Sequence, residues 1–399
     1  MTVPDFHAVD FHVVFSQLEQ QLWQHRRFWQ CQPMQQAELA EPYADLPAAL
    51  AQALQSLDLT QCAALDADDD ALHQQLGHHF ADVVIPEIPR HPAKAVAAPF
   101  WLATGIGGRK WQQICQFAGA VGQRSRPVME WCAGKGHLGR VLAAQFGVAV
   151  QSIEWQASLC EHGLQLAQQW QLPQSFLHLD VLNQATAPYF QPAQQWVALH
   201  ACGDLHRVGL AQALAAGTSA LALVPCCYHL QSADSYQYRS LRGQQSQLML
   251  SKADLRMAVQ GHATGGARIA RLSQQEMTWR HAFRVYAQSQ GRTSYQPLSS
   301  VAKQLFSHDA MAFFSFACQQ HALPLPTPWQ LQEALQQAEQ RLLVQRRLEL
   351  CQHLFRRPLE IYLVLDLVLW LQEHHYQVAL HQLCESQLTP RNLLITANL

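Results

Sequence analysis

A regular alternation of strand-like and helix-like segments between Pro127 and His229 constrains the fold of this chain more than any other feature. Short runs rich in β-branched or apolar residues are separated by amphipathic stretches, an order that favours a parallel sheet with helices on both faces. We therefore expect an α/β fold whose polar strand ends meet at one edge of the sheet. The expected strands are Pro127–Trp131, Ala149–Trp155, Phe176–Val181, Trp196–Cys202 and Ala220–Cys226, and the expected helices are His137–Phe146, Ala157–Trp170 and Leu205–Ala216.

The alternation stops at His229 and returns near the C-terminus. A helix from about Leu359 to Glu373, followed by strand-like runs at Tyr376–Leu383 and Asn392–Ala397, predicts an antiparallel pair that completes the sheet. Four prolines make Val83–Pro99 an extended linker. The sequence therefore predicts four parts: a helical, acidic N-terminal region (1–95), an α/β core (96–230), a basic, mainly helical insertion (231–355) and the C-terminal part of the core (356–399).

The charges are unevenly distributed, although the formal net charge is only -2. Residues 1–95 contain thirteen acidic and four basic residues, whereas residues 235–303 contain ten basic and two acidic residues. The basic stretch indicates an anionic partner, or it is a solvated surface that balances the acidic N-terminal region. Eleven cysteines without disulfide-like spacing, no signal-peptide pattern and no apolar run of membrane length predict a cytoplasmic protein without a membrane partner. The oligomeric state is not predicted.

The segment Glu130-Trp-Cys-Ala-Gly-Lys-Gly-His-Leu-Gly139 joins the first strand of the alternation to its first helix. Its glycines let the backbone approach a ligand, and the helix N-terminus offers free N–H groups. The spacing also satisfies the dinucleotide pattern G-x-G-x-x-G, so a nicotinamide-dependent oxidoreductase is an alternative. A carboxylate at Glu130 repels a pyrophosphate and attracts a sulfonium or ammonium group, which favours S-adenosylmethionine as the cofactor.

Two further acids follow the next two strands. Glu154 can accept hydrogen bonds from the ribose hydroxyls of the cofactor, and Asp180 can accept from the adenine amino group. The expected cofactor-binding residues are Glu130, Cys132, Ala133, Gly134, Lys135, Gly136, Glu154, Asp180, Val181 and His200.

Polar residues also follow the fourth and fifth strands, in Leu199-His-Ala-Cys-Gly-Asp-Leu205 and Val224-Pro-Cys-Cys-Tyr-His229. Because parallel strands end at one edge, we expect these side chains to converge near the transferred methyl group. Three interpretations stay open: acid–base chemistry on the acceptor, a zinc site, or structural packing of small buried cysteines. Adjacent cysteines do not match the usual C-x₂₋₄-C ligand spacing, so no metal is expected. The first candidate for the general base is His229, aided by Asp204. The expected catalytic residues are His229, Asp204, His200, Cys227 and Tyr228. The zinc alternative would use Cys202, Cys226, Cys227 and His229.

These motifs in this order resemble the class I methyltransferase fold. More narrowly, Glu130–Gly139, Leu199–Leu205 and Cys226–His229 resemble the methyltransferase-like 25 family, as do the downstream segments Leu250–Leu255 and Thr389–Leu393. The pairing of His-x-Cys-Gly with Cys-Cys-x-His is also similar to the Trm13 family of tRNA 2′-O-methyltransferases. The resemblance implies a Rossmann-like fold, S-adenosylmethionine held at the glycine loop and the two acids after it, and substrate-side loops at His200–Asp204 and Cys226–His229.

The expected reaction is in-line transfer of the sulfonium methyl group to an oxygen or nitrogen nucleophile. An Asn-Pro-Pro-Tyr motif, which marks methylation of exocyclic amines, is missing, so adenine N6 is not the expected target. RNA is the leading substrate class, because the basic stretch can contact phosphates and its aromatic residues can stack on bases. The alternatives are that these aromatic residues form a core of their own, that the chain methylates a protein, or that it is a non-catalytic binding module. The aromatic residues are Tyr236, Tyr238, Trp279, Phe283, Tyr286 and Tyr295.

Overall fold

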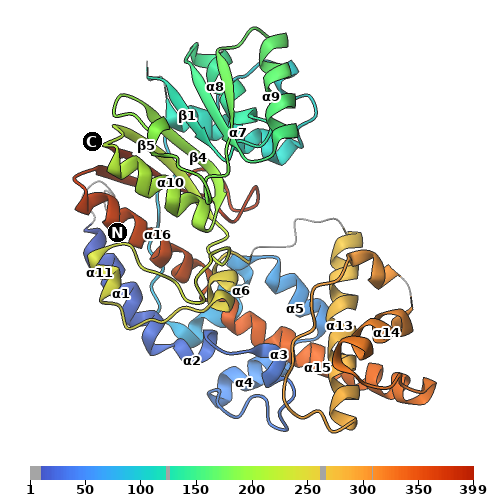
Figure 1. Ribbon diagram of the computed structural model, residues 1–399. Helices are drawn as coiled ribbons and strands as arrows, with labels where there is room; N and C mark the ends of the chain where they lie inside the picture. The colour runs from blue at the N-terminus through green and yellow to red at the C-terminus, as the bar shows by residue number, and fades with distance from the viewer. Residues whose placement is uncertain (1–9, 123–125, 261–266, 308) are drawn as a thin grey trace. The chain divides into compact units, whose positions relative to one another are not determined.

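The computed structural model (Figure 1) describes residues 10–122, 126–260, 267–307 and 309–399. These residues form two compact units that alternate along the chain. The sheet unit comprises Met1–Gln24, Val84–Gln260 and Arg356–Leu399, and the helical unit comprises His25–Val83 and Gly261–Phe355. The region expected over residues 1–95 and the insertion expected over residues 231–355 are therefore each shared between the two units.

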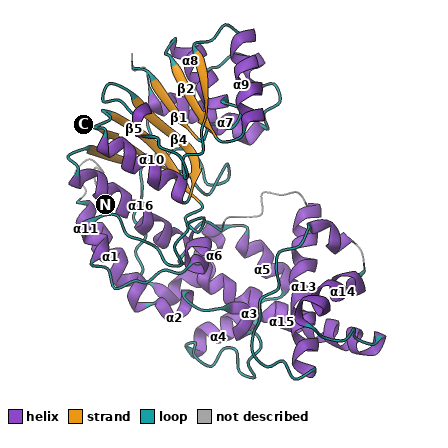
Figure 2. Ribbon diagram, viewed as in Figure 1, coloured by secondary structure: helices purple, strands orange, loops and turns teal. Residues whose placement is uncertain are grey.

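The described part of the sheet unit contains one seven-stranded sheet (Figure 2). Its strands are β1 (Val128–Trp131), β2 (Val150–Glu154), β3 (Gln174–His178), β4 (Gln195–Cys202), β5 (Ala220–Cys226), β6 (Gln377–Gln382) and β7 (Leu393–Asn398). Their spatial order is β3-β2-β1-β4-β5-β7-β6. Strands β1 to β5 are parallel, and β7 pairs antiparallel with β5 and with β6. This arrangement confirms the expected α/β fold class. The strand order reverses between β1 and β4, the point where ligands bind in open α/β sheets.

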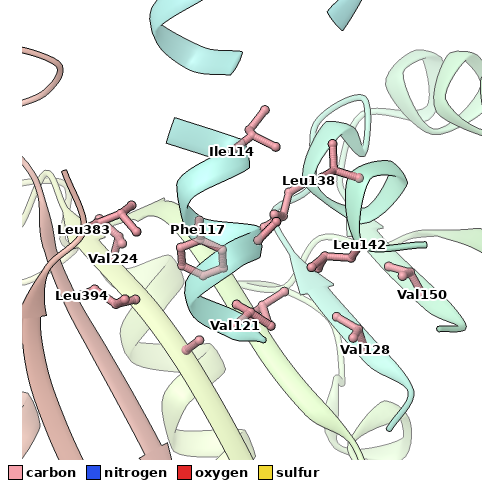
Figure 3. Close-up of a cluster of buried hydrophobic side chains, with 14 of the residues drawn as sticks. Ile114, Phe117, Val121, Val128, Leu138, Leu142, Val150, Val224, Leu383 and Leu394 are labelled. Atoms are coloured by element: carbon pink, nitrogen blue, oxygen red, sulfur yellow. The ribbon is translucent and has the colours of Figure 1, made fainter. Parts of the chain in front are cut away.

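Helices cover both faces of the central strands, because these strands are apolar on both sides. On one face, Val128 of β1 packs with Phe117 and Leu142 of two helices (Figure 3). On the other face, a helical glycine, Gly209, lies against the indole ring of Trp131, where a Cβ atom would approach within 2.8 Å. The helices of the sheet unit are α1 (Phe11–Gln24), α7 (Gly108–Val121), α8 (His137–Phe146), α9 (Ala157–Gln169), α10 (Asp204–Ala215), α11 (Leu241–Gln244), α12 (Lys252–Ala258) and α16 (Arg356–Glu373).

The third strand ends earlier than the sequence predicts. It stops at His178, and Asp180 lies in the turn that follows. The Asp180 carboxylate accepts hydrogen bonds from the Leu182 N–H at 3.1 Å and from Asn183 Nδ2 at 2.8 Å. A side chain that accepts from the backbone two residues later stabilises a turn in competition with a strand. The prediction of a strand through Val181 was therefore wrong by three residues at this end.

Helix α16 connects the C-terminal strands to the rest of the sheet unit. It contacts β6, β7, α11, α12 and α1. The ring of Phe15 on α1 stacks on Tyr362 of α16 with centroids 4.4 Å apart. Asp366 of α16 is fully buried and accepts hydrogen bonds from the backbone N–H groups of Arg239 and Ser240 and from the Tyr236 hydroxyl. Residues after β5 are thereby held to the C-terminal helix.

The helical unit is organised around its longest helix, α15. Its core gathers large side chains such as Trp279, Phe283, Phe313 and Phe314. Its helices are α2 (Arg26–Trp29), α3 (Pro33–Gln36), α4 (Ala48–Gln55), α5 (Leu59–Asp66), α6 (Asp69–Leu76), α13 (Ala267–Ser289), α14 (Ala310–His321) and α15 (Pro328–His353). Among the residues that the structure describes, no helix combines the length and the apolar character needed to cross a membrane.

Candidate active site

The glycine loop between β1 and α8 is held in shape by the end of β2. The backbone N–H of Gly134 donates to Glu154 Oε2 at 2.9 Å. Gly134 and Gly136 both have positive φ, at 59° and 64°. A Cβ atom on Gly136 would lie 2.4 Å from Phe176, whereas no described heavy atom lies within 4 Å of the place where a Gly134 Cβ would be. Gly136 therefore serves close packing, and the backbone at Gly134 is open to a ligand.

Glu130 is buried beneath this loop rather than exposed at its rim. Only 4% of its surface is accessible, and its Oε2 accepts from the Ser152 hydroxyl at 2.5 Å. Burial raises the pKa of Glu130 to about 7, against the hydrogen bonds from Ser152 and the Gly139 N–H. A buried side chain with this pKa attracts a cationic cofactor less than the ionised carboxylate that the sequence suggests. Glu130 is instead placed to support the loop and the first turn of α8.

Glu154 ends β2 with both carboxylate oxygens engaged by backbone N–H groups. Oε2 accepts from Gly134, and Oε1 accepts from Gln156 at 3.0 Å. Each oxygen has a second lone pair, so the carboxylate can still accept from ribose hydroxyls. Of the other expected cofactor residues, Val181 is buried, and Cys132, Ala133, Lys135 and Asp180 are partly exposed.

The ends of β4 and β5 carry backbone strain. His200 and Cys227 have φ angles of 61° and 47°, and Cys132 after β1 has 55°. Positive φ is uncommon for residues other than glycine and costs about 1–3 kcal/mol, so it persists only where the surroundings enforce it. Three such residues follow or interrupt the three central strands at the edge where a ligand is expected. This clustering supports a functional site at that edge.

His200 is held as a neutral ring. Its Nε2–H donates to Oε1 of Gln113 on α7 at 2.8 Å. Burial, with the charge of Arg391 acting in the same direction, lowers the pKa of His200 to about 4. Because a ring of such low basicity is a weak proton acceptor, His200 is better suited to positioning neighbouring side chains than to acting as a general base.

The loop after β5 folds back onto the loop after β4. The Gly203 N–H donates to the Cys226 carbonyl at 3.1 Å, and the Asp204 N–H donates to the Leu230 carbonyl at 3.0 Å. The Asp204 carboxylate accepts from the backbone N–H of Ser232 at 2.7 Å. The two substrate-side loops thus form one hydrogen-bonded assembly, in which Asp204 anchors the second loop. No interaction between the carboxylate of Asp204 and His229 is recorded in the described structure, so the expected pairing of these two residues is not supported.

The residues at the tip of the loop after β5 differ in solvent accessibility. The ring of His229 is partly exposed, but its Nδ1 is buried and has no hydrogen-bond partner within the described chain. Burial and the nearby Arg256 charge lower the pKa of His229. Tyr228 is only 2% exposed, and its ring lies edge-on to His206. Because a buried phenol cannot reach an acceptor, the prediction of Tyr228 as a catalytic residue is not supported.

Three cysteines come together below this loop. The Sγ atoms of Cys202, Cys226 and Cys227 all lie within 4.8 Å of one another, and those of Cys202 and Cys226 are 3.2 Å apart. Hydrogen bonds from the other two thiols lower the pKa of Cys227, and the charges of Arg391 and His229 act in the same direction. The sequence predicts that these three cysteines lie at one edge of the sheet, and the structure brings their sulfur atoms together.

Some residues near the site escaped the sequence analysis because they come from distant segments. Lys110 on α7 lies near enough to influence the pKa of both Glu130 and His200. Arg391 precedes β7 and donates to the Val259 carbonyl at 2.9 Å. The only sequence signal for Arg391 was the segment Thr389–Leu393, which we noted for its resemblance and to which we gave no role.

The basic stretch, residues 235–303, only partly agrees with the prediction of a surface for an anionic partner. Arg242 pairs with Glu19 in the sheet unit, and Arg284 pairs with Glu38 at 2.8 Å in the helical unit. These pairs match the interpretation in which the basic residues balance the acidic N-terminal region. The prediction that the aromatic residues stack on bases is wrong for most of them, because they pack inside the protein. Tyr236, Trp279, Phe283 and Tyr286 are buried, Tyr238 is half-buried, and Tyr295 is exposed.

Comparison with known proteins agrees with this geometry. Residues 109–234 match a family model described as a methyltransferase domain. The match runs from the start of α7 through the glycine loop into the segment that follows β5. A comparison with curated proteins gives no match.

Several solved methyltransferase structures are distantly similar. Geranyl diphosphate methyltransferase is 15% identical over 33% of this chain and 61% of its own, with a TM-score of 0.23. The cyclopropane synthase MmaA2 from Mycobacterium tuberculosis is 17% identical over 45% and 57%, with a TM-score of 0.25. The 23S rRNA methyltransferase ErmE is 16% identical over 59% and 96%, with a TM-score of 0.24. The chain spans less than two thirds of the length of the first three structures it matches. At such low TM-scores, we draw nothing about the substrate from them.

The glycine loop, the reversal of strand order and the family match define residues 109–234 as a methyltransferase domain of class I. The match to a methyltransferase domain supports S-adenosylmethionine as the cofactor of this domain.

Proposed function

We propose that the whole chain transfers the methyl group of S-adenosylmethionine to an oxygen or nitrogen atom of RNA. The observation that carries the methyl-transfer part is the open backbone at Gly134 beside Glu154, at the same sheet edge as the joined loops after β4 and β5. A ligand on the glycine loop would thus have its reactive end toward a second set of polar side chains. The resemblance to the methyltransferase-like 25 and Trm13 families supports the same assignment.

In this proposal, the chain contributes mainly by holding the donor and acceptor atoms in line and close. Glu154 and the glycine loop hold the cofactor, and Glu130 supports that loop from below. His229 takes the acceptor's proton, because its ring is partly exposed at the tip of the loop after β5. His200 and Asp204 keep the loops in place.

RNA is favoured as the acceptor by exposed arginines on the helical unit. Arg268 and Arg271 are exposed in the first turns of α13, and Arg292 is exposed shortly after it. Phosphate contacts supply most of the affinity of nucleic-acid binding, and they need no aromatic stacking. Arg268 and Arg271 together are therefore expected to contribute about two units to the slope of log affinity against log salt.

The test uses radiolabelled S-adenosylmethionine with extract from a strain that lacks the protein, separated into RNA and protein fractions. We expect label in RNA, and a loss of about 10²–10⁴-fold for His229→Ala. Label in the protein fraction alone overturns RNA as the acceptor, and label in neither fraction overturns the methyl-transfer proposal.

A binding measurement separates the basic residues by role. A double variant, Arg268→Ala with Arg271→Ala, should flatten the salt dependence of RNA binding. Arg346→Ala removes an arginine of the same unit that is paired with Glu349 at 2.7 Å, and it should leave the slope unchanged. Equal slopes for all three proteins would remove this surface from RNA binding.

A further inference from the structure

We infer that Cys202, Cys226 and Cys227 form a binding site for a soft divalent cation, zinc in the first place, beside the methyl-transfer site. The inference depends on the proposed function only for the role of the metal and not for its binding. It differs from the expectation of no metal, which rested on the unusual spacing of the adjacent cysteines. The sulfur atoms here come from the ends of two neighbouring strands.

The distances suit one metal ion. Tetrahedral zinc binds thiolate sulfur at about 2.3 Å, which places two ligating sulfurs about 3.8 Å apart. The pair Cys202 and Cys226 is 3.2 Å apart, and all three sulfurs lie within 4.8 Å of one another. A separation of 3.2 Å is far longer than the bond of about 2.05 Å in a disulfide. The three cysteines are free thiols.

The backbone departs from regular geometry where it brings these sulfurs together. Successive residues of a strand point to opposite faces, so Cys226 and Cys227 should diverge. The positive φ of 47° at Cys227 ends the alternation at that point. On the neighbouring strand, the register of β4 shifts between Leu199 and Cys202, so that Cys202 pairs with Cys226. Two independent irregularities therefore serve one cluster of sulfur atoms.

The donor set selects the metal. Thiolate ligands favour zinc, copper(I) and iron–sulfur centres over magnesium, calcium or manganese. When zinc binds, three Zn–S bonds form, each thiol releases its proton to solvent, and no group is oxidised or reduced. Zinc sites with three protein ligands keep a fourth position for water or a substrate atom, as catalytic sites do.

We assign that fourth position to the acceptor atom. A zinc ion there would make the proton of a bound acceptor easier to remove. Cys202 and Cys227 are half-buried, whereas Cys226 is buried. An acceptor atom would thus approach the metal from the side of Cys202 and Cys227.

The test uses the full chain, treated with a chelator under reducing conditions and titrated with Co²⁺ and then with Zn²⁺. We expect one equivalent of Co²⁺ to give a sulfur-to-cobalt charge-transfer band, and Zn²⁺ to abolish it. Cys202→Ser and Cys227→Ser should each weaken Co²⁺ binding about tenfold or more. Cys31→Ser, at a half-buried cysteine of the helical unit, should bind like the wild type.

Three results would overturn the inference. They are no charge-transfer band in the wild type, the same band in every cluster variant, or a Cys202–Cys226 disulfide in the native protein. Azide added to the Co²⁺ form tests the open position. A shift of the visible spectrum supports it, and an unchanged spectrum overturns the acceptor-binding role.

Calorimetry of S-adenosylmethionine binding on the same samples keeps the two proposals apart. Protein that binds the cofactor but no metal overturns the metal site alone. Protein that binds Co²⁺ through sulfur but places no label in RNA overturns the proposed RNA activity alone.

Discussion

Replacing Gly203 with alanine tests whether the loops after β4 and β5 act as one assembly. Gly203 has a φ of 56°, and a Cβ atom there would lie 1.8 Å from the Leu230 carbonyl oxygen. That oxygen accepts the Asp204 N–H at 3.0 Å, and the Leu230 N–H donates to the Cys227 carbonyl at 2.8 Å. To relieve the contact, the Leu230 carbonyl must move by about 1 Å or more, which breaks the hydrogen bond from Asp204.

The expected loss of stability follows from these two effects. A left-handed backbone costs a residue with a Cβ atom roughly 1–2 kcal/mol. Loss of one hydrogen bond adds about 1 kcal/mol, so Gly203→Ala should lower the free energy of unfolding by about 2–3 kcal/mol. Gly147→Ala is the matched control, because Gly147 has a φ of 65° and no described heavy atom lies within 4 Å of the added Cβ. It should show only the first cost, and urea unfolding measures both.

The same pair of variants separates cofactor binding from methyl transfer. Gly203 lies outside the loop Gly134–Gly136, so the Kd for S-adenosylmethionine should change by no more than about threefold. Transfer should fall about a hundredfold, because a displacement of about 1 Å in a positioning loop has that effect. If both variants lose equal free energy of unfolding, or if Gly203→Ala transfers methyl groups at the wild-type rate, the reasoning is refuted.

Three more substitutions test individual side chains. Burial raises the pKa of Glu130 from 4.5 to about 7, so its stabilising proton is fully bound below about pH 4.5 and is lost as the pH rises through 7. The loss of this proton lowers the free energy of unfolding by about 3 kcal/mol. Urea unfolding of Glu130→Gln should not show this pH-dependent decrease. Identical pH profiles of the wild type and the variant would contradict the explanation. Glu154→Gln removes the charge that anchors Gly134 and should weaken S-adenosylmethionine binding about 10- to 100-fold in calorimetry. Glu161→Gln, on the exposed face of α9, is the control and should leave the affinity unchanged. Equal affinities of the two variants would remove Glu154 from the cofactor site. Tyr228→Phe removes a hydroxyl without a partner in the described structure, so transfer and Tm should stay unchanged, and a large drop in transfer would show that Tyr228 acts in catalysis.

The local elements were predictable because their causes are local. The strand Ala220–Cys226 and the helix His137–Phe146 have the predicted bounds, since periodicity and the flanking glycines determine them. The end of the third strand was missed because the Asp180 side chain stabilises a turn, which composition alone does not distinguish from a strand end.

The amino-acid sequence by itself determined the α/β class, the glycine loop and the two loops at one sheet edge, because these follow from hydrophobic periodicity and the parallel order of strands. Tertiary structure decided which side chains are accessible there: it buried Glu130 and Tyr228, and it brought Arg391 to the site from the far end of the chain. It also placed Cys202 opposite Cys226, through a register shift that depends on pairing between strands. Burial and register arise from contacts between distant segments, and no short sequence window contains both partners of such a contact.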